Sequence, residues 1–334
     1  MTMTMSTDVT VKLDDRVRLI SAVLALTSFP DTVQAKRPHG THIHARMTRK
    51  NLAEHSQHPA VLDLEMLLAK GAPLEAIYTL ALLVRLDEGK LTTKAPAWLP
   101  PDWAAHLVDF YQTSGVIAWW QNDADSWMRA TEEATQMFGA VQFKPFLSKF
   151  LGDFPERLTF IPNISYPTER ELALKFGGEY ICIVPPRIAW GESPPWPFNE
   201  DPAHIYRALL ASTGHMMMLN FLREHESEIS LEGKKPLPLT DQFMSMNPTW
   251  AEQFTYLFVA SAVAMFLEDH YNRKEADAFI LMERRVTGLE VLPAAITVYR
   301  RYLREVEEGN YKNILDAIPT FSRQLRVAHR MIKL

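Results

Sequence analysis

The sequence has a single cysteine, no apolar run long enough to span a membrane and no excess of basic residues. One cysteine cannot form an internal disulfide, so a reducing compartment is expected. The longest largely apolar run, residues 254–267, has 14 residues, whereas a membrane span needs about 20; it is therefore expected to be a core helix. With 35 basic and 40 acidic residues, the chain has no electrostatic basis for binding nucleic acid or an anionic membrane.

The first residues, MTMTMS, include no basic residue and no long apolar segment, so no signal peptide is expected. Together with the single cysteine, this predicts a cytoplasmic protein. Hydrophobic residues make up 47% and charged residues 22% of the chain, as is typical of soluble globular proteins. A chain of 334 residues is expected to form one large domain or about two, with a core that needs no disulfide or metal.

Hydrophobic periodicity predicts a predominantly α-helical α+β protein with a small group of strands. The glycine pair 177–178 is expected to follow a loop or a further short strand at 168–176, and residues 28–58 are expected to form a long connection. Strands are predicted at residues 10–13, 158–161 and 180–184, and helices at 16–26, 59–70, 73–86, 103–120, 124–138, 143–151, 203–228, 249–270, 275–285, 289–307 and 310–333.

The order of these elements predicts two regions. Residues 1–152 are expected to form a mainly helical N-terminal region, and residues 153–334 a region of short strands followed by helices. Because no Gly/Ser-rich linker separates them, we expect the two regions to pack as one unit. The proline-rich segment 185–202 is expected to be a rigid, irregular loop that shields a site or connects across a groove.

Two groups of residues raise the question of nucleophilic or metal chemistry. Cys182 lies in an alternating, β-branched segment, which favours a core thiol over a reactive one. His39, His42 and His44 are close enough in sequence to chelate one ion in an extended loop. No acidic residue occurs between Asp31 and Glu54 to complete such a site, so a solvated polar loop is favoured.

The whole chain carries several short motifs in a particular order. They are TVKLDDRVRL at residues 10–19, HPAV at 58–61, DFY at 109–111 followed by a tryptophan pair at 119–120, and FLG at 150–152. In this order and local character the sequence resembles, over roughly residues 8–325, an uncharacterised bacterial family of unknown function in the gluzincin branch of the metallopeptidases. The resemblance implies a zincin-like region with a small sheet and two long core helices.

The resemblance also implies where zinc chemistry would lie. Zincin peptidases carry His-Glu-x-x-His on a helix, where two histidines chelate zinc and the glutamate acts as base. Here His215 occupies the second histidine position, but Ala211 and Ser212 stand where the first histidine and the glutamate would be. On the next long helix, Ala260 stands at the position of the third ligand. One imidazole does not hold catalytic zinc.

The resemblance with these departures predicts a catalytically inactive metallopeptidase-like protein, a pseudoenzyme that acts as a binding or structural subunit. Its partner is expected to be a protein or peptide, with no nucleic acid, no membrane and no cofactor. Trp190 and Trp196, on the proline-rich loop, are candidate contacts at the rim of the former cleft. Packing over the strands is the alternative interpretation of both tryptophans.

Two other functions remain open from the sequence. The first is a metal-dependent hydrolase or peptidase with a rearranged zinc site, in which His215 acts with His225, Glu226, Glu268 or His270; zinc is a cofactor only under this hypothesis. The second is an all-helical interaction module in which the strand patterns are incidental.

Overall fold

The structure is a computed structural model that describes residues 7–34, 41–187, 194–229 and 234–332. It divides into two compact units, of which the first comprises Met1–Ala140 and Glu156–Asp201 and the second Val141–Pro155 and Pro202–Leu334. This division differs from the expected one near residue 152. The strands group with the N-terminal helices because β1, at the start of the chain, pairs with β4.

The sheet of the first unit has four strands in the order β1-β4-β6-β5. β1 (Val9–Val11), β4 (Arg157–Pro162) and β6 (Glu179–Val184) are parallel, whereas β5 (Leu172–Phe176) runs antiparallel to β6. Gly177 and Gly178 join β5 to β6 with φ angles of 57° and 74°, the left-handed conformation that a two-residue hairpin turn requires and glycine adopts without strain. The segment before this glycine pair is therefore a strand.

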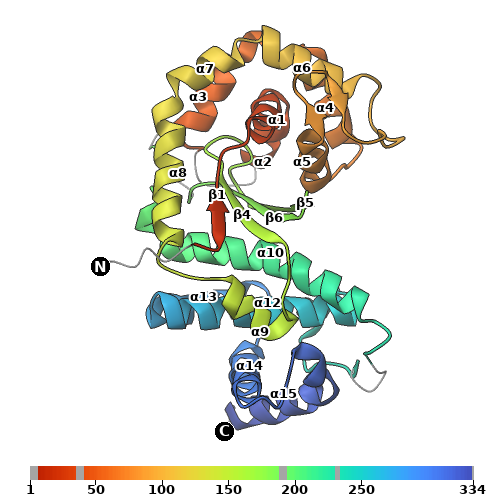
Figure 1. The fold of residues 1–334 in the computed structure, drawn as a ribbon, viewed down its shortest axis with the longest axis vertical. Coiled ribbons are helices and arrows are strands. Elements are labelled where there is room, and N and C mark those ends of the chain that lie inside the picture. The colour runs from red at the N-terminus through yellow and green to blue at the C-terminus, as the bar shows by residue number, and fades with distance from the viewer. Residues whose placement is uncertain (1–6, 35–40, 188–193, 230–233, 333–334) are drawn as a thin grey trace. The chain divides into compact units, whose positions relative to one another are not determined.

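Helix α1 (Asp15–Leu26) is almost wholly buried in the first unit. Asp14 begins it by accepting a hydrogen bond from the Arg16 amide, and other helices form an arc around it (Figure 1). The unit also contains α2 (Phe29–Gln34), α3 (Ile43–Asn51), α4 (Pro59–Ala69), α5 (Leu74–Leu82), α6 (Trp103–Thr113), α7 (Val116–Asn122), α8 (Ala124–Phe138) and the short hairpin of β2 (Val84–Arg85) and β3 (Lys90–Leu91).

Two expectations for this unit were wrong. The segment 28–58 is not a long connection, because it contains α2 and α3; the N-cap of α3 is His42, whose Nδ1 accepts a hydrogen bond from the Ala45 amide. The expected helix 103–120 is divided into α6 and α7 at Gly115, where φ is +72°. At Gly115 a glycine backbone signal outweighed the hydrophobic period on which the predicted helix depended. In 28–58 the prediction depended on prolines, a glycine and the lack of a sustained period, whereas two short helices form there.

The described part of the second unit is helical. Its helices are α9 (Lys144–Leu151), α10 (Pro202–Glu224), α11 (Asp241–Met246), α12 (Trp250–His270), α13 (Arg273–Val286), α14 (Leu292–Glu307) and α15 (Ile318–Ile332). Thr249 and Glu252 form a reciprocal capping box at the start of α12, which satisfies amides that the first helical turn leaves unbonded. α10, α13 and α14 all pack against α12.

Aromatic side chains form the core of the second unit. Phe150 of α9 stacks on Tyr302 of α14 at a ring-centroid distance of 5.3 Å and meets Phe258 of α12 edge-on at 5.1 Å. Tyr302 also donates a hydrogen bond of 2.6 Å to the carbonyl of Lys149. These contacts explain why α9 belongs with the C-terminal helices, although it precedes β4 in the sequence.

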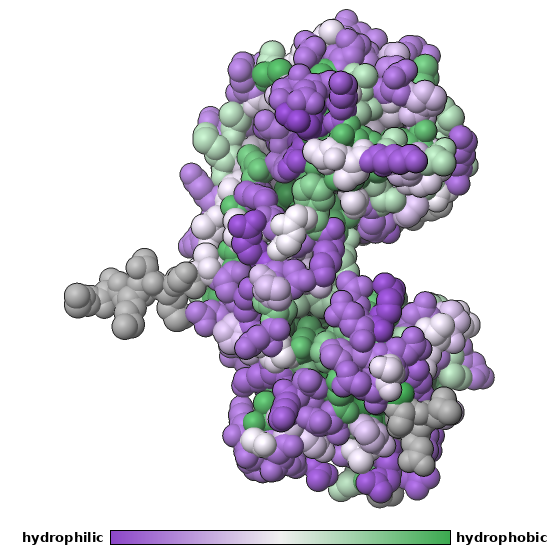
Figure 2. Space-filling model, turned by 45° about the vertical axis from the view of Figure 1, so that its right-hand side comes forward, coloured by the Kyte–Doolittle hydropathy of each residue, from purple (hydrophilic) through white to green (hydrophobic). Residues whose placement is uncertain are grey.

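The predicted fold class is therefore confirmed as predominantly helical with a small mixed sheet, and the sheet argues against the all-helical module. Cys182 is fully buried in β6, as expected of a core thiol. Among the described residues, one helix, α12, is long and apolar enough to cross a membrane by length and composition, but most of it is packed inside the protein, as predicted for a core helix. In the face that Figure 2 shows, hydrophilic residues predominate and hydrophobic ones occur in small patches.

Candidate functional site

The contact between α10 and α12 contains the positions at which the resemblance places zinc chemistry. Gly214 of α10 is buried there, and a Cβ atom added to it would lie 3.8 Å from Cγ2 of Val259 on α12. That separation is ordinary van der Waals contact. Ala260, at the third-ligand position, is buried, and Ala211 and Ser212 are partly buried on α10. The two helices therefore meet through small side chains.

His215 lies next to this contact and is partly buried. Burial lowers the pKa of its imidazole below the usual value of 6.5, and the negative charge of Glu252 partly opposes this effect. The Glu252 carboxylate is already bonded to Thr249, accepting from its amide at 2.9 Å and from its hydroxyl at 2.8 Å. His215 is thus a neutral imidazole at pH 7, and the nearby carboxylate of Glu252 is already bonded in the cap of α12.

The other residues of the rearranged zinc site each have a local contact. His225 forms an ion pair of 2.6 Å with Glu228, and Glu226 forms one of 3.3 Å with Lys234. The ring of His270 packs on that of Phe266 one turn earlier in α12. Within the described part of the chain, no group of three or more histidine, cysteine, aspartate or glutamate side chains is arranged to hold a metal ion.

Arg300 of α14 holds the two acids near the end of α12. Its guanidinium donates two hydrogen bonds, of 2.6 and 2.7 Å, to Asp269 and a third, of 3.0 Å, to Glu268. Asp269 is the main cause of the raised pKa of Arg300. The contact between Arg300 and Asp269 is therefore a bidentate arginine–carboxylate pair. Glu268, one of the candidate metal ligands, is bonded to the same guanidinium.

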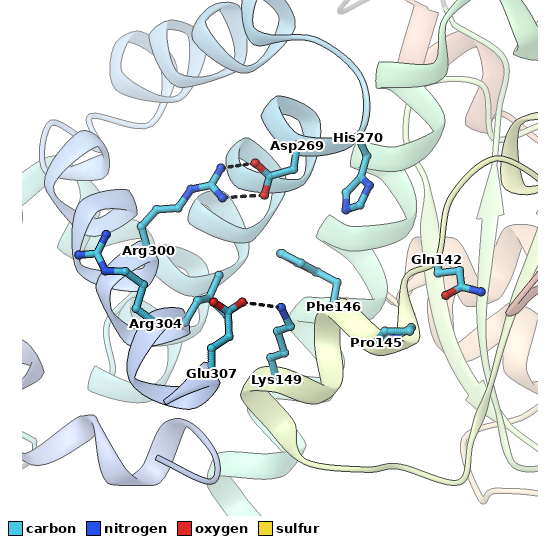
Figure 3. A pocket seen from close by; sticks show the side chains of 10 residues that line it. Gln142, Pro145, Phe146, Lys149, Asp269, His270, Arg300, Arg304 and Glu307 are labelled. Carbon is cyan, nitrogen blue, oxygen red and sulfur yellow. Dashed lines mark hydrogen bonds and ion pairs between the residues drawn. The ribbon is translucent and has the colours of Figure 1, made fainter. Parts of the chain in front are cut away.

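A pocket of about 410 Å³ lies beside this network in the second unit. Two ion pairs contribute to its wall, Asp269 with Arg300 and Lys149 with Glu307, the latter at 3.1 Å. Figure 3 shows Phe146 between the two pairs. The remaining lining residues are Gln142, Pro145, His270, Leu303 and Arg304.

A second pocket, of about 180 Å³, lies within the first unit and includes Trp196. Trp196 is 44% exposed and lines this pocket; its place at the rim of a former peptidase cleft stays a prediction. Trp190 lies outside the described residues. Four residues on one face of α8 contribute to the same pocket, together with His44 of α3, Ile164 after β4, and Pro194, Pro195, Pro197 and Phe198; the α8 residues are Ser126, Arg129, Ala130 and Glu133.

The histidines predicted to form a solvated loop have different surroundings. His39 lies outside the described residues. His42 is 3% exposed, burial lowers its pKa to about 3, and its Nε2 has no hydrogen-bond partner within the described part of the chain. His44 Nδ1 lies 3.0 Å from Oδ1 of the buried Asp123. The loop prediction was wrong because both residues belong to the first turn of α3, which packs against α1.

Asp123 also lies near a partly buried arginine. The guanidinium of Arg18 is sandwiched between Trp120 and Trp127, with ring-centroid distances of 4.2 and 4.7 Å, and its positive charge acts on Asp123. These residues were not predicted from the sequence, because His44, Asp123 and Arg18 come from separate helices. One signal for this pocket was present in the sequence, namely the three- and four-residue spacing that places Ser126, Arg129, Ala130 and Glu133 on one helical face.

Compared with protein-family models, with curated proteins and with solved structures, the chain gives no match.

Proposed function

We propose that the chain is a binding protein without peptidase chemistry, in which the second unit engages a peptide or protein segment. The contact between Gly214 and Val259 carries this proposal. A tetrahedral zinc site needs three or four ligand atoms within about 2.3 Å of the ion, whereas this contact is filled by packed side chains. Among the described residues, the acid whose charge acts on His215 beside this contact is Glu252, which is already bonded in the helix cap.

The pocket of the second unit favours recognition over catalysis. Its carboxylates, Asp269 and Glu307, are each bonded to a cation of the same pocket, so neither is directed at a substrate proton. Arg304 is exposed on the same wall and has no ion-pair partner among the described residues. An exposed arginine beside paired charges suits a partner that brings an acidic side chain.

The catalytic part of the proposal is tested by zinc content and peptide cleavage. The purified chain and His215→Ala are loaded with zinc, dialysed and assayed on a mixed peptide library. We expect far less than one zinc per chain and the same background cleavage in both proteins. One zinc per chain, together with cleavage that His215→Ala abolishes, would overturn the proposal in favour of the rearranged hydrolase.

The binding part is tested by selecting displayed random peptides on the wild-type chain. We expect the selected peptides to be enriched in aspartate and glutamate, and their binding to be lost in Arg304→Glu. Arg301→Glu is the matched control, because Arg301 is exposed on the same helix but does not line the pocket. No acidic enrichment, or equal loss of binding in both variants, would contradict a role for this pocket.

A further inference from the structure

The pocket of the first unit lies where helix α8 faces the end of a parallel strand. Ser126, Arg129, Ala130 and Glu133 of α8 are spaced at three- and four-residue intervals, so they share one helical face. Ile164, two residues beyond the end of β4, lies opposite. Open sheets with parallel strands commonly bind ligands outside the carboxyl ends of their strands. This pocket occupies that position.

The pocket contains hydrogen-bond donors that the protein itself does not use. In the part of the chain that the structure describes, the Arg129 guanidinium and the Ser126 hydroxyl have no partner. His44 also lines the pocket, with its Nδ1 at 3.0 Å from the Asp123 carboxylate. A carboxylate on one ring nitrogen fixes the orientation of the imidazole, and the other nitrogen of the neutral ring is an acceptor.

The acid in the same pocket is already engaged. Glu133 accepts a hydrogen bond of 2.9 Å from the Phe198 amide through Oε2. That bond holds the 3-10 turn Phe198–Glu200 against α8, supported by a 3.3 Å bond from the Asn199 amide group to Gln136. Glu133 therefore serves to position the segment that carries Trp196.

An exposed aromatic ring supplies the apolar wall. Trp196 lines the pocket between Pro195 and Pro197, and Phe198 and Ile164 add buried apolar surface. The guanidinium of Arg187 lies 5.7 Å from the centroid of the Trp196 ring. A wall of indole and proline rings with a few donors at one end is the usual composition of a small-molecule site.

We propose that the pocket formed by α8, His44 and residues 194–198 binds a small organic oxyanion that carries a flat apolar group. Arg129 and Ser126 donate hydrogen bonds to the carboxylate or phosphate oxygens, and Trp196 contacts the apolar part. A volume of about 180 Å³ limits the enclosed part of the ligand to roughly the size of one aromatic ring with its acidic group. This site is in the first unit and does not depend on the function proposed for the second.

Calorimetric titration of the full chain tests the proposal with three probes of similar size: benzoate, phenyl phosphate and the neutral benzyl alcohol. We expect at least one anion to bind with a dissociation constant below about 1 mM and about tenfold more tightly than benzyl alcohol, because an arginine–oxyanion contact is charge-assisted. Whether the carboxylate or the phosphate binds better then distinguishes the two ligand chemistries.

Matched variants assign any binding to this pocket. Arg129→Met is expected to weaken the anion about tenfold, whereas Arg85→Met, an exposed arginine of the same unit that does not line the pocket, is expected to leave it unchanged. Trp196→Ala is expected to weaken every probe, and Trp98→Ala is its control, because Trp98 is 45% exposed and lies outside the pocket. Circular dichroism shows whether each variant is folded.

Two results would overturn the proposal. The first is absence of binding by both anions up to about 10 mM in the folded wild-type chain. The second is anion binding that Arg129→Met and Arg85→Met weaken equally, which would indicate a general response to positive charge.

Discussion

In the pocket of the second unit, Arg300 and Lys149 are bonded to Asp269 and Glu307, whereas in the pocket of the first unit Arg129 has no partner among the described residues. Each pocket contains a histidine and an arginine without an ion-pair partner among the described residues, Arg304 in the second unit and Arg129 in the first. They differ in the charges around that arginine, because the acids of the second pocket are paired with Arg300 and Lys149. A ligand of the second pocket that reaches beyond Arg304 must compete with these ion pairs, whereas the anion proposed for the first would take up donors that are otherwise open to water.

The surroundings of His215 in the second unit and His44 in the first also differ. His215 lies beside a closely packed contact between two helices, and the acid that acts on it is already bonded in a helix cap. His44 is held by a buried aspartate and borders a pocket. In the sequence His215, within a long helix, was the more conspicuous of the two, whereas in the structure His44 is the one of this pair that borders a pocket.

The largest expected effect comes from opening the closed contact of the second unit. Gly214→Leu forces additional side-chain atoms between α10 and α12, where a Cβ atom is already 3.8 Å from Val259. Overpacking of this kind is expected to lower the free energy of unfolding by about 3 kcal/mol, measured by urea denaturation. Gly214→Ala is the control, because alanine fits at ordinary contact and is expected to be neutral or stabilising by up to about 1 kcal/mol.

If Gly214→Leu were as stable as the wild type, the contact would have room for side-chain atoms. The packing argument against a zinc site beside His215 would then fail. Loss of stability in Gly214→Ala as well would show that the helices are closer than the structure has them, which would strengthen that argument.

The second largest effect is expected in the pH dependence of stability, and its cause is the buried His42 of the first unit. His42 has a pKa lowered to about 3 by burial, so the folded protein keeps it neutral while the unfolded chain, with a pKa near 6.5, takes up a proton as the pH falls. Stability is therefore lost as the pH falls below about 6.5, and between pH 7 and pH 5 the expected loss is about 2 kcal/mol. Urea denaturation at pH 7, 6 and 5 measures it.

His42→Asn retains a side-chain acceptor at the helix N-cap but has no titrating group, so its stability is expected to change less over this range. The pKa of His215 is also lowered by burial, and this residue contributes a loss of the same sign that remains in the variant. An identical pH dependence in His42→Asn and the wild type would show that His42 is not buried as a neutral group.

The sequence predicted features that depend on neighbours along the chain. The helix 249–270, the core thiol Cys182 and the strands ending at the glycine pair 177–178 all follow local patterns of apolar spacing or turn residues. Gly115 was missed as a helix-boundary residue because the apolar spacing continues across it, and His42 was missed because the residues around it show no sustained apolar period. Local rules thus recovered most elements but not every boundary.

The candidate sites depend on contacts that no local pattern contains. Asp123 meets His44, and Arg300 meets Asp269, only after separate helices have packed. Likewise, the pairing of β1 with β4 brings residue 9 beside residue 158, so the strands joined the N-terminal helices against expectation. Trp196 was predicted as a contact at the rim of a former peptidase cleft, whereas the pocket that it lines together with residues of α8 was not predicted.

A smaller effect is expected from opening the ion pairs of the second pocket. Arg300→Met leaves Glu268 and Asp269 without their shared cation, and since these side chains are partly exposed, the expected loss is about 1 kcal/mol. Arg301→Met is the control, because its contact with Glu305 is 3.8 Å long and exposed. Urea denaturation in low and in about 1 M salt measures the difference, which screening should reduce. Equal stability of the two variants at low salt would mean that the Arg300 network contributes nothing measurable.

The smallest effect is expected for Lys149→Met, which removes the other ion pair of the same pocket. Both Lys149 and Glu307 are well exposed, so the pair should contribute less than about 0.5 kcal/mol. The bond from Tyr302 is to the backbone carbonyl of residue 149 and persists in the variant. A loss above about 1 kcal/mol by urea denaturation would therefore be due to the ammonium group itself. The ion pair between Lys149 and Glu307 would then be stronger than its exposure indicates, and a peptide partner would have to break this pair in order to bind.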